Sequence, residues 1–542
     1  MRAGSEGVDV VVVGGGHNGL VAAGLLAKRG ARVTVFERRA KVGGAAVTEQ
    51  PWGPEFKMPA LSYVMSMMPP TVLRELDLVR HGYHVFPQHG YFVPYSDGRF
   101  LQLPNDDPAR RHEEIAKFSR RDADAFAGWE SWLGRLAGTL GPLLTSVPPK
   151  LGSKRPRDLR EQLALAWKLR RLDTRGVGDV TRLFTTSVAD LLDEYFESPQ
   201  MQGVLAVSGI IGTWAGPRSA GTAFVMAHHQ IGDVGDGRLA AWGFPAGGMG
   251  AVSGALRSAA ESFGAVVRTE APVAHIVVRN GRATGVVLQS GEEVRADVVI
   301  AATHPKLTFL EHVDRSELPD DFVSDIERWK SRSGSVKVNL ALDRLPEFSG
   351  KPGFDPEVHG GTIVLAESLD EIEVAFQDAV AGRPAVAPFA DICIPSVFDR
   401  SLAPEGAHVM SMFTQWVPHR YSEKPMSSEL DSYADRVIAR VERVAPGFTA
   451  SILHRQVIGP YEMEREYGLI GGNIFHGELS ADQMFHMRPA PGYADFRTPI
   501  KGLYQASSAT HGGGGVTGIP GLNVVRQIVA DRRRSRLRRA SR

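Results

Sequence analysis

The residues with the clearest chemical role form a glycine-rich loop near the N-terminus. Gly14, Gly16 and Gly19 have the spacing G-x-G-x-x-G. A β-branched run, 8–13, precedes them, and a helix-favouring run, 20–28, follows. In such a βαβ unit the first glycine permits a tight turn, the second lets the backbone approach a pyrophosphate, and the third lets the helix pack on the strand. The N–H groups at the start of the helix stabilise the phosphate charge, so the pattern predicts a dinucleotide site.

An acidic residue follows where the ribose of such a cofactor is expected. Glu37 closes the next extended run, about 20 residues after the loop. Its carboxylate would accept hydrogen bonds from ribose hydroxyls and repel a 2′-phosphate, which favours FAD or NAD over NADP. Gly43 and Gly44 then let a longer cofactor continue through the protein, which favours FAD. The predicted cofactor-binding residues of this part are Gly14, Gly16, His17, Asn18, Gly19, Glu37, Arg38, Gly43, Gly44 and Ala45.

A second glycine cluster lies near the C-terminus. Four successive glycines, 512–515, remove every side chain where a flat aromatic ring could lie against backbone. A helix opening near 518–521 would direct its N–H groups at the negative charge of a reduced flavin. The alternative is a flexible glycine loop.

Candidate proton carriers are few. His511, Asn473 and His476 are the candidate catalytic residues, because they are expected near the flavin ring and a histidine can carry a proton during oxidation. Ordinary structural hydrogen bonding is the alternative for each. The histidines lack metal-ligand spacing, so no metal is predicted. Cys393 is the only cysteine, which excludes an intramolecular disulfide and a redox-active cysteine pair.

Composition limits the partners. The chain of 542 residues has 62 basic and 61 acidic side chains, so no net charge favours nucleic acid. The first residues, MRAGSEG, do not resemble a signal peptide, and no long apolar run predicts a membrane span. The expected location is the cytoplasm, with peripheral membrane contact left open. The candidate contacts are a predicted frayed tail, 532–539, and a segment with the basic residues Lys150, Lys154, Arg155, Arg157, Arg160, Lys168, Arg170, Arg171 and Arg175.

The elements that must position these residues can also be predicted. Asn280-Gly281 separates two extended runs, which is a strong hairpin signal. Four more extended runs lie between Gly334 and Pro418, and they predict a second sheet. The stretch from about Leu101 to Tyr195 favours helix.

Four segments carry a family resemblance. They are VVVGGGHNGLVAAGLLAKRGARVTVFERRAKVGGAAVTE, FPAGGMGAVSGAL, GGNIFHGELSADQMFHMRP and GLYQASSATHGGGGVTGIPGLN, in that order. The chain resembles the phytoene desaturase-related FAD flavoproteins. Within them it is most similar to the branch that holds cyanobacterial-type β-carotene ketolase and the animal pyridine nucleotide-disulfide oxidoreductase domain-containing protein 2.

The resemblance implies an α/β fold with a discontinuous Rossmann-like FAD-binding domain and an inserted α+β substrate domain containing a mixed or antiparallel sheet. The expected FAD-binding segments are 1–85, 240–305 and 480–542, and the substrate segments are 86–239 and 306–479. Val273 would flank the adenine through its backbone, and Gly514, Gly515 and Val516 would lie along the flavin ring. Many relatives have an acidic residue where this chain has 506–509, so Ser508 is the candidate contact there.

The resemblance further implies a flavin oxidoreductase that dehydrogenates an apolar substrate, such as a carotenoid or another lipid. Oxygen, quinone and NAD(P) remain open as electron acceptors. The stretches 63–68 and 410–416 are rich in methionine and aromatic residues and could line the substrate channel, or they could be ordinary core. Two alternatives stay open: ketolase-type oxygenation, and a non-catalytic prenyl-lipid carrier on the same fold.

Overall fold

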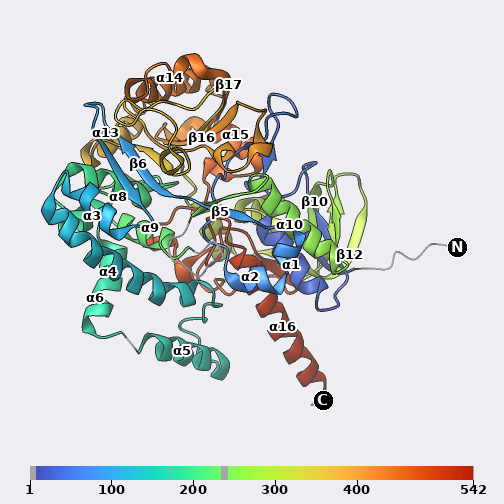
Figure 1. The fold of residues 1–542 in the computed structure, drawn as a ribbon. Coiled ribbons are helices and arrows are strands. Elements are labelled where there is room, and N and C mark those ends of the chain that lie inside the picture. Colours follow the sequence, from blue (N-terminus) through green and yellow to red (C-terminus); the bar gives the residue numbers. More distant parts are fainter. Residues whose placement is uncertain (1–7, 171, 233–241, 541–542) are drawn as a thin grey trace.

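The computed structural model describes residues 8–170, 172–232 and 242–540. Three features interpreted above lie outside these residues: the segment MRAGSEG, Arg171, and the predicted domain boundary at 239–240. Two seven-stranded sheets organise the described chain, and helices cover them (Figure 1).

The first sheet joins strands from the two ends and the middle of the sequence. Its order is β10-β11-β12-β1-β2-β9, and β18 pairs with β12. The pairs β1–β2, β1–β12, β2–β9 and β12–β18 are parallel, and β10–β11–β12 are antiparallel. The strand bounds are β1 Val8–Val13, β2 Val33–Phe36, β9 Val266–Arg268, β10 Val273–Arg279, β11 Arg282–Leu288, β12 Glu293–Ala301 and β18 Leu503–Gln505.

Both faces of this sheet are covered, which explains the continuous apolar run in β1. Successive side chains of a strand point to opposite faces. Val10 and Val12 accordingly pack in one core cluster with residues of α1 (His17–Ala27), α10 (Met249–Ser262) and α16 (Ile519–Ala540). Val11 and Val13 pack in a second cluster with the β10–β11 hairpin and α11 (Asp320–Arg328).

The predicted hairpin is confirmed. Asn280 and Gly281 connect β10 to β11 with φ of 52° and 68°, the left-handed values that a two-residue type I′ turn requires.

The second sheet has the order β17-β13-β16-β15-β14-β6-β7. All its pairs are antiparallel except β14–β6, so the sheet is mixed. The strand bounds are β6 Gly90–Pro94, β7 Phe100–Pro104, β13 Ser335–Leu342, β14 Thr362–Leu365, β15 Phe389–Cys393, β16 His408–Gln415 and β17 Ile452–Ile458. The predicted α/β class, a Rossmann-like FAD-binding fold with a second mixed sheet, is confirmed.

Helices and short strands complete the fold. The helices are α2 Pro70–Glu75, α3 Pro108–Ala116, α4 Arg120–Leu144, α5 Pro156–Leu169, α6 Thr174–Thr185, α7 Val188–Asp193, α8 Pro199–Ile210, α9 Thr222–His229, α12 Pro356–His359, α13 Leu369–Val380, α14 Ser427–Val444 and α15 Pro460–Tyr467. The short strands are β3 Thr48–Glu49, β4 Met58–Pro59, β5 Val85–Pro87 and β8 Gly243–Pro245. β5 pairs with β8 and β3 with β4.

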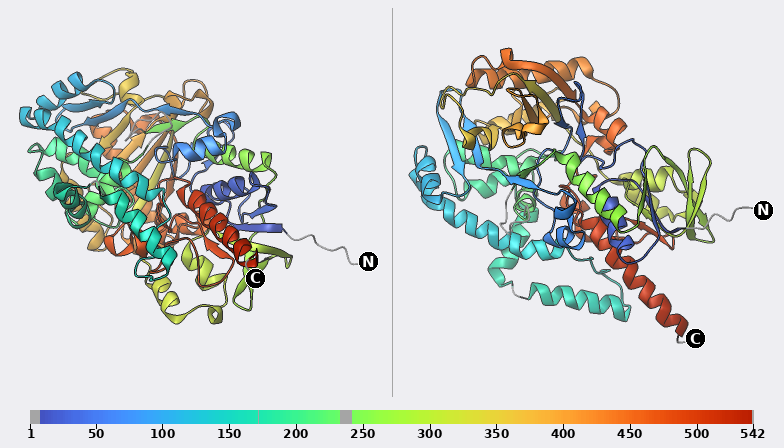
Figure 2. Two further views of the ribbon diagram at one scale, coloured as in Figure 1. Left: turned by 90° about the horizontal axis from the view of Figure 1, so that it is seen from below. Right: turned by 45° about the vertical axis from the view of Figure 1, so that its right-hand side comes forward.

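Two sequence expectations are corrected here. The stretch predicted to be helical from Leu101 begins as strand β7, because these residues pair with β6 at the edge of the second sheet. The predicted frayed tail 532–539 is part of α16, which continues to Ala540. The last turns of α16 and the helix α5 project from the same side of the molecule (Figures 1 and 2). Among the described helices, none is long and apolar enough to cross a membrane.

Candidate functional site

The N-terminal glycine loop has a separate reason for each glycine. Gly14 has a φ of 101°, a left-handed value that disfavours other residues. A Cβ on Gly19 would lie 2.2 Å from the carbonyl oxygen of Gly14, so helix α1 could not pack against the loop. A Cβ on Gly16 would meet no protein atom within 4 Å. The open space at Gly16 lies at the N-terminus of α1, where unpaired N–H groups favour an anion.

Glu37 is buried and braces this loop. Its Oε2 accepts a hydrogen bond from the Gly15 N–H at 2.8 Å, and its Oε1 accepts one from the Arg39 N–H at 2.9 Å. Charge-assisted bonds of this kind are stronger than neutral ones. The carboxylate therefore fixes the path of the backbone on both sides of the expected ribose position.

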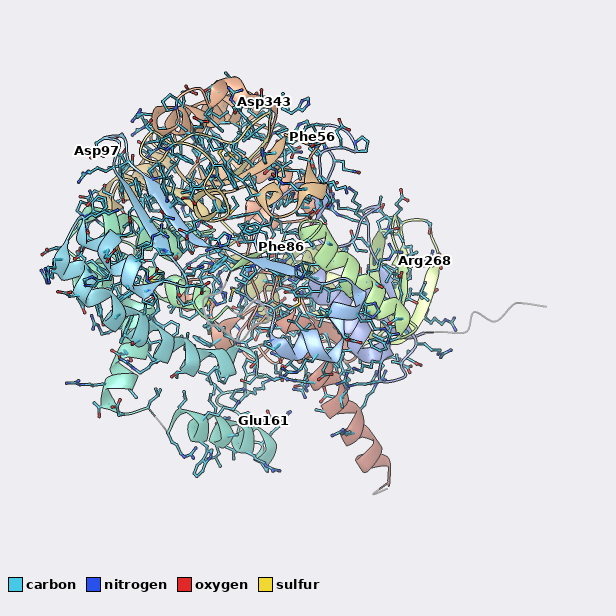
Figure 3. The ribbon with its side chains drawn as sticks, in the orientation of Figure 1. Phe56, Phe86, Asp97, Glu161, Arg268 and Asp343 are labelled. Atoms are coloured by element: carbon cyan, nitrogen blue, oxygen red, sulfur yellow. The ribbon has the colours of Figure 1, made fainter. Side chains whose placement is uncertain are left out.

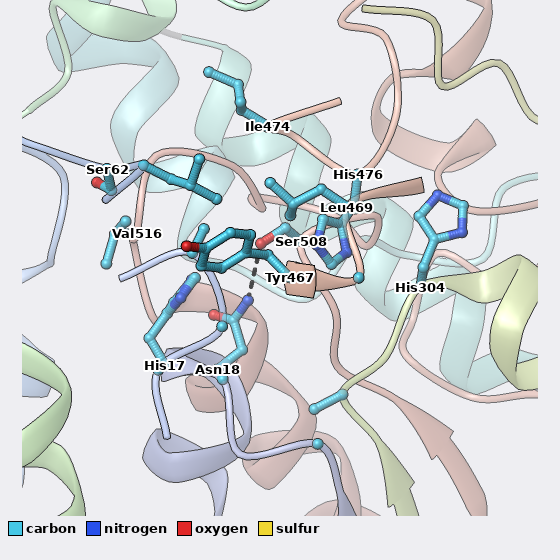
Figure 4. A pocket seen from close by; sticks show the side chains of 18 of the residues that line it. His17, Asn18, Ser62, His304, Tyr467, Leu469, Ile474, His476, Ser508 and Val516 are labelled. Carbon is cyan, nitrogen blue, oxygen red and sulfur yellow. Dashed lines mark hydrogen bonds between the residues drawn. The ribbon is translucent and has the colours of Figure 1, made fainter. Parts of the chain in front are cut away.

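Segments near the two ends of the chain line one cavity of about 370 Å³. Asn18 Nδ2 donates to Ser508 Oγ at 3.2 Å, a bond between residues 490 apart in sequence (Figure 4). The predicted cofactor residues that line the cavity are Gly14, Gly16, His17, Asn18, Glu37, Arg38, Gly43, Gly44, Ala45, Val273, Ser508, Gly515 and Val516.

Gly19 and Gly514 do not line this cavity. Gly19 packs helix against strand, as the motif predicts. Gly514 has a φ of 95°, and a Cβ there would lie 2.6 Å from the ring of Phe475. Position 514 therefore requires a glycine because the Phe475 side chain packs against it. Phe475 in turn lines the cavity.

Buried polar atoms on the cavity wall lack partners. They include His17 Nε2, Asn18 Oδ1, Arg39 Nη1 and His476 Nδ1. Buried polar groups in proteins are normally hydrogen-bonded, so a group of unpaired ones around a single cavity indicates a polar ligand. Together with the open space at Gly16, these atoms fit a dinucleotide such as FAD.

Two of the predicted catalytic residues do not line the cavity and are hydrogen-bonded within the protein. His511 does not line the cavity, and its Nε2 lies 2.9 Å from the carbonyl oxygen of Leu143 at the end of α4. Asn473 donates to the Arg332 carbonyl oxygen and accepts from the N–H groups of Phe475 and Gly477. These bonds hold the turn that follows Asn473.

His476 does line the cavity, close to His304. The two rings lie 5.5 Å apart, and in Figure 4 His476 lies near Ser508 while His304 stands farther to the right. Burial lowers the pKa of His476 to about 3 and also lowers that of His304 well below its usual value. Both rings are neutral at pH 7, so they can accept a proton or a hydrogen bond but add no positive charge.

The cavity continues to the second sheet, where it is lined by residues that sequence reasoning did not assign. Lys337 of β13 is 1% exposed and faces Tyr63 and Phe413. Burial lowers the pKa of Lys337 to about 7. The sequence did contain a signal that could have pointed to Lys337, because it is the only charged residue in the apolar run SVKVNLAL. His229, Trp242 and Glu311 also line the cavity without having been predicted.

Comparison with known proteins agrees with this geometry. Residues 19–521 match the family model described as flavin containing amine oxidoreductase. The chain is 38% identical to pyridine nucleotide-disulfide oxidoreductase domain-containing protein 2 of Rattus norvegicus, over 96% of this chain and 93% of that protein. It is 25% identical to one of the subunits of limonene dehydrogenase from Castellaniella defragrans, over 96% and 94% of the two chains.

Among solved structures, an oxidoreductase from Methanosarcina mazei has a TM-score of 0.61 at 16% identity, covering 96% of this chain and all of that one (100%). The fold is thus shared beyond recognisable sequence similarity. The relation to the phytoene desaturase-related flavoproteins, inferred from the four motifs, is confirmed. The protein is an oxidoreductase that needs a small-molecule substrate and an electron acceptor. The chain belongs to the family of flavin containing amine oxidoreductases, and its cofactor is FAD.

Proposed function

We propose that the protein dehydrogenates an apolar small molecule, of the carotenoid or lipid type, at the second-sheet end of the cavity. The observation that carries this proposal is the lining of that end, which is continuous with the glycine loop and rich in apolar side chains: Val64, Met67, Ile211, Phe413, Ile474 and Phe475. Limonene, named for the Castellaniella defragrans relative, is a hydrocarbon, which supports an apolar substrate.

The residues of this chain have distinct tasks in the proposed reaction. Bound FAD supplies the acceptor for a hydride. The loop at Gly16 and the N-terminus of α1 would hold the phosphates, and the Glu37 carboxylate fixes the loop. Val273, Ser508, Gly515 and Val516 line other parts of the cavity and would border the rest of the cofactor. The apolar wall would exclude water and place the reacting carbon. His476 is the candidate for accepting a proton, because it is the one predicted catalytic residue that lines the cavity.

The experiment is anaerobic mixing of the FAD-loaded protein with fractionated cellular lipid extracts, while the flavin absorbance band is followed. A fraction that contains the substrate should bleach the band, and its product should have lost two hydrogen atoms by mass. A product that has gained oxygen would instead indicate ketolase-type oxygenation. Failure of every apolar fraction to bleach the band would contradict the proposal.

We also propose that helix α5 contacts an anionic membrane surface. Leu159, Leu163 and Trp167 recur every fourth residue and are 43%, 70% and 65% exposed, so they form one apolar stripe on the helix. Arg155 and Arg170 lie at the two ends of α5. A helix with apolar and cationic side chains on its free face is typical of binding at a lipid headgroup layer. Figure 3 shows Glu161 of the same helix well apart from the main body.

A further inference from the structure

A buried guanidinium group lies behind the cavity wall, in the segment between α15 and β18. Arg488 is 2% exposed, and its Nη2 donates hydrogen bonds to the carbonyl oxygens of Phe475 and Ser508 at 2.8 and 3.0 Å. Its Nη1 donates to the carbonyl oxygens of Glu478 and Gln483, both at 3.4 Å. All these acceptors are neutral backbone groups, so the hydrogen bonds hold the guanidinium group without balancing its charge.

Arg488 has no carboxylate partner among the ion pairs of the described residues. In the same segment, the Glu478 carboxylate pairs with Arg332. The Asp482 carboxylate pairs with Lys330. Burial lowers the pKa of Arg488 to about 9, so the group keeps its charge at pH 7. A buried charge without a counter-charge is unfavourable, and negative charge on a bound molecule would stabilise it.

The two shorter hydrogen bonds of Arg488 lead to the part of the wall where the flavin ring is expected. Phe475 and Ser508 both line the cavity. The Phe475 ring also packs on Gly514, one of the residues expected along the flavin ring. Burial is the main cause of the low pKa of His476, and the charge of Arg488 contributes to it. The positive potential of Arg488 therefore extends to a residue of the cavity wall.

A positive charge at this place acts differently on the two redox states of FAD. The diphosphate carries the same charge in both states, so its attraction to Arg488 does not change the reduction potential. The flavin ring gains negative charge when it is reduced, and a fixed cation stabilises that charge most strongly in a site closed to water. Charge near the flavin ring is one of the means by which a protein tunes this cofactor. The neutral rings of His476 and His304 supply no such charge.

We infer that Arg488, held behind Phe475 and Ser508, stabilises the negative charge of reduced FAD and thereby raises the reduction potential of the cofactor. Arg488 does not itself line the cavity, so it is a positioning and charge-supplying residue and not a catalytic one. A higher potential makes the removal of a hydride more favourable, whatever the substrate is. The inference therefore does not depend on the proposed apolar substrate.

Reduction of the FAD-loaded protein against indicator dyes tests this inference without any substrate. The midpoint potential is measured at about pH 6, where a lysine at position 488 would keep its proton. Arg488→Met should bind reduced FAD, relative to oxidised FAD, at least about tenfold less tightly than the wild type does, which corresponds to a midpoint potential lower by about 30 mV or more. Arg488→Lys keeps the charge and should retain most of the wild-type potential.

A control separates the charge from a merely structural role. Arg526→Met removes an exposed arginine of α16 whose Nη1 donates to the Thr145 carbonyl oxygen at 2.5 Å, and it should leave the potential unchanged. FAD content and melting temperature are measured for every variant. An unchanged potential in Arg488→Met, or an equal loss in Arg488→Lys, would overturn the inference even where FAD content falls. Binding of the diphosphate, or packing of the wall, would then explain the residue.

The wild-type protein provides a measurement that does not depend on the folding of a variant. Its reduced flavin should keep its negative charge to a lower pH than free reduced FAD does, which the absorption spectrum of the reduced protein reports. Protonation at the same pH as in free reduced FAD would overturn the inference. Bleaching by lipid extracts is scored separately, so the proposed dehydrogenation can fail while this inference holds, and the reverse.

Discussion

At the scale of single residues, the three loop glycines are required for different physical reasons. Protein atoms surround the position of a Cβ at Gly19, and the backbone at Gly14 is left-handed. Gly16 has neither constraint: its φ is −67°, and no protein atom lies within 4 Å of a Cβ. The protein alone would accept a side chain at Gly16, so we propose that the cofactor is what requires a glycine there.

We therefore predict that Gly16→Val folds normally and loses FAD. The valine methyl groups would occupy the space of the pyrophosphate, and FAD affinity should fall by about a hundredfold or more. The flavin absorbance of the purified protein and its melting temperature measure the two effects. Gly254→Val is the matched control, because Gly254 of α10 also has no neighbour within 4 Å of a Cβ but lies away from the cavity. A yellow, fully loaded Gly16→Val protein would show that the loop does not hold the phosphates.

At the scale of elements, the C-terminal motif depends on the junction between β18 and α16. Arg497 Nε and Nη2 donate to the two carboxylate oxygens of Asp531 at 2.9 and 2.6 Å, and the Tyr504 hydroxyl donates to the same group at 3.0 Å. Tyr504 belongs to β18 and Asp531 to α16. The strand and helix that flank the glycine cluster are thereby fixed to each other.

Asp531→Ala should destabilise the protein by about 1–3 kcal/mol, because it leaves a partly buried Arg497 without its bidentate partner. Urea denaturation measures the change. Asp325→Ala removes a surface pair with Arg328, whose side chain is 71% exposed, and should change stability by less than about 0.5 kcal/mol. Equal losses of unfolding free energy in the two variants would mean that the Arg497–Asp531 pair stabilises the protein no more than a surface ion pair does.

The stripe on α5 gives a second prediction at this scale. Leu163→Asp should weaken binding to phosphatidylglycerol vesicles by about tenfold, since it replaces an inserted apolar group with a repelled one. Co-sedimentation measures the bound fraction, and neutral phosphatidylcholine vesicles should bind less of the wild-type protein. Val374→Asp, at a 60% exposed position of α13, serves as control. If both variants bind like the wild type, α5 does not contact the membrane.

At the scale of the whole molecule, buried neutral histidines make stability depend on pH. Burial lowers the pKa of His17 and His511 to about 4 and of His228 and His476 to about 3. The unfolded chain takes up these protons near pH 6.5, about 2.5 to 3.5 pH units before the folded protein does. Their stabilising contribution is therefore complete above that pH and is lost as the pH falls.

Between about pH 6.5 and pH 5 the free energy of unfolding should fall by about 1.4 kcal/mol per pH unit for each such histidine. Asp391, whose pKa burial raises to about 6, has the opposite sign and offsets at most one of them. Urea denaturation at several pH values measures the slope. A free energy of unfolding that stays constant over this range would mean that the histidines are hydrated or paired in solution.

Local patterns in the sequence were enough to predict several elements. Residues 8–13 form β1, because β-branched residues favour strands and this run buries its side chains on both faces of the sheet. SVKVNLAL forms β13 over the predicted residues, and Asn280-Gly281 forms the expected turn. Strands β6, β7 and β17 were missed. β6 and β7 pair with each other, but β7 begins the stretch that was predicted to be helical, and β17 pairs with β13, which lies far away in the sequence.

The sequence by itself determined the dinucleotide loop, the hairpin, the Rossmann-like class and the flavin cofactor, since each depends on spacings within a short segment or on the order of such segments. Only the tertiary structure brought Asn18 to Ser508, gave His511 and Asn473 structural partners, and placed Lys337 in the cavity wall. The physical reason is that the groups surrounding a polar side chain after folding decide whether it is hydrogen-bonded within the protein or lines the cavity. Those groups come from strands and helices hundreds of residues apart, and no local spacing encodes them.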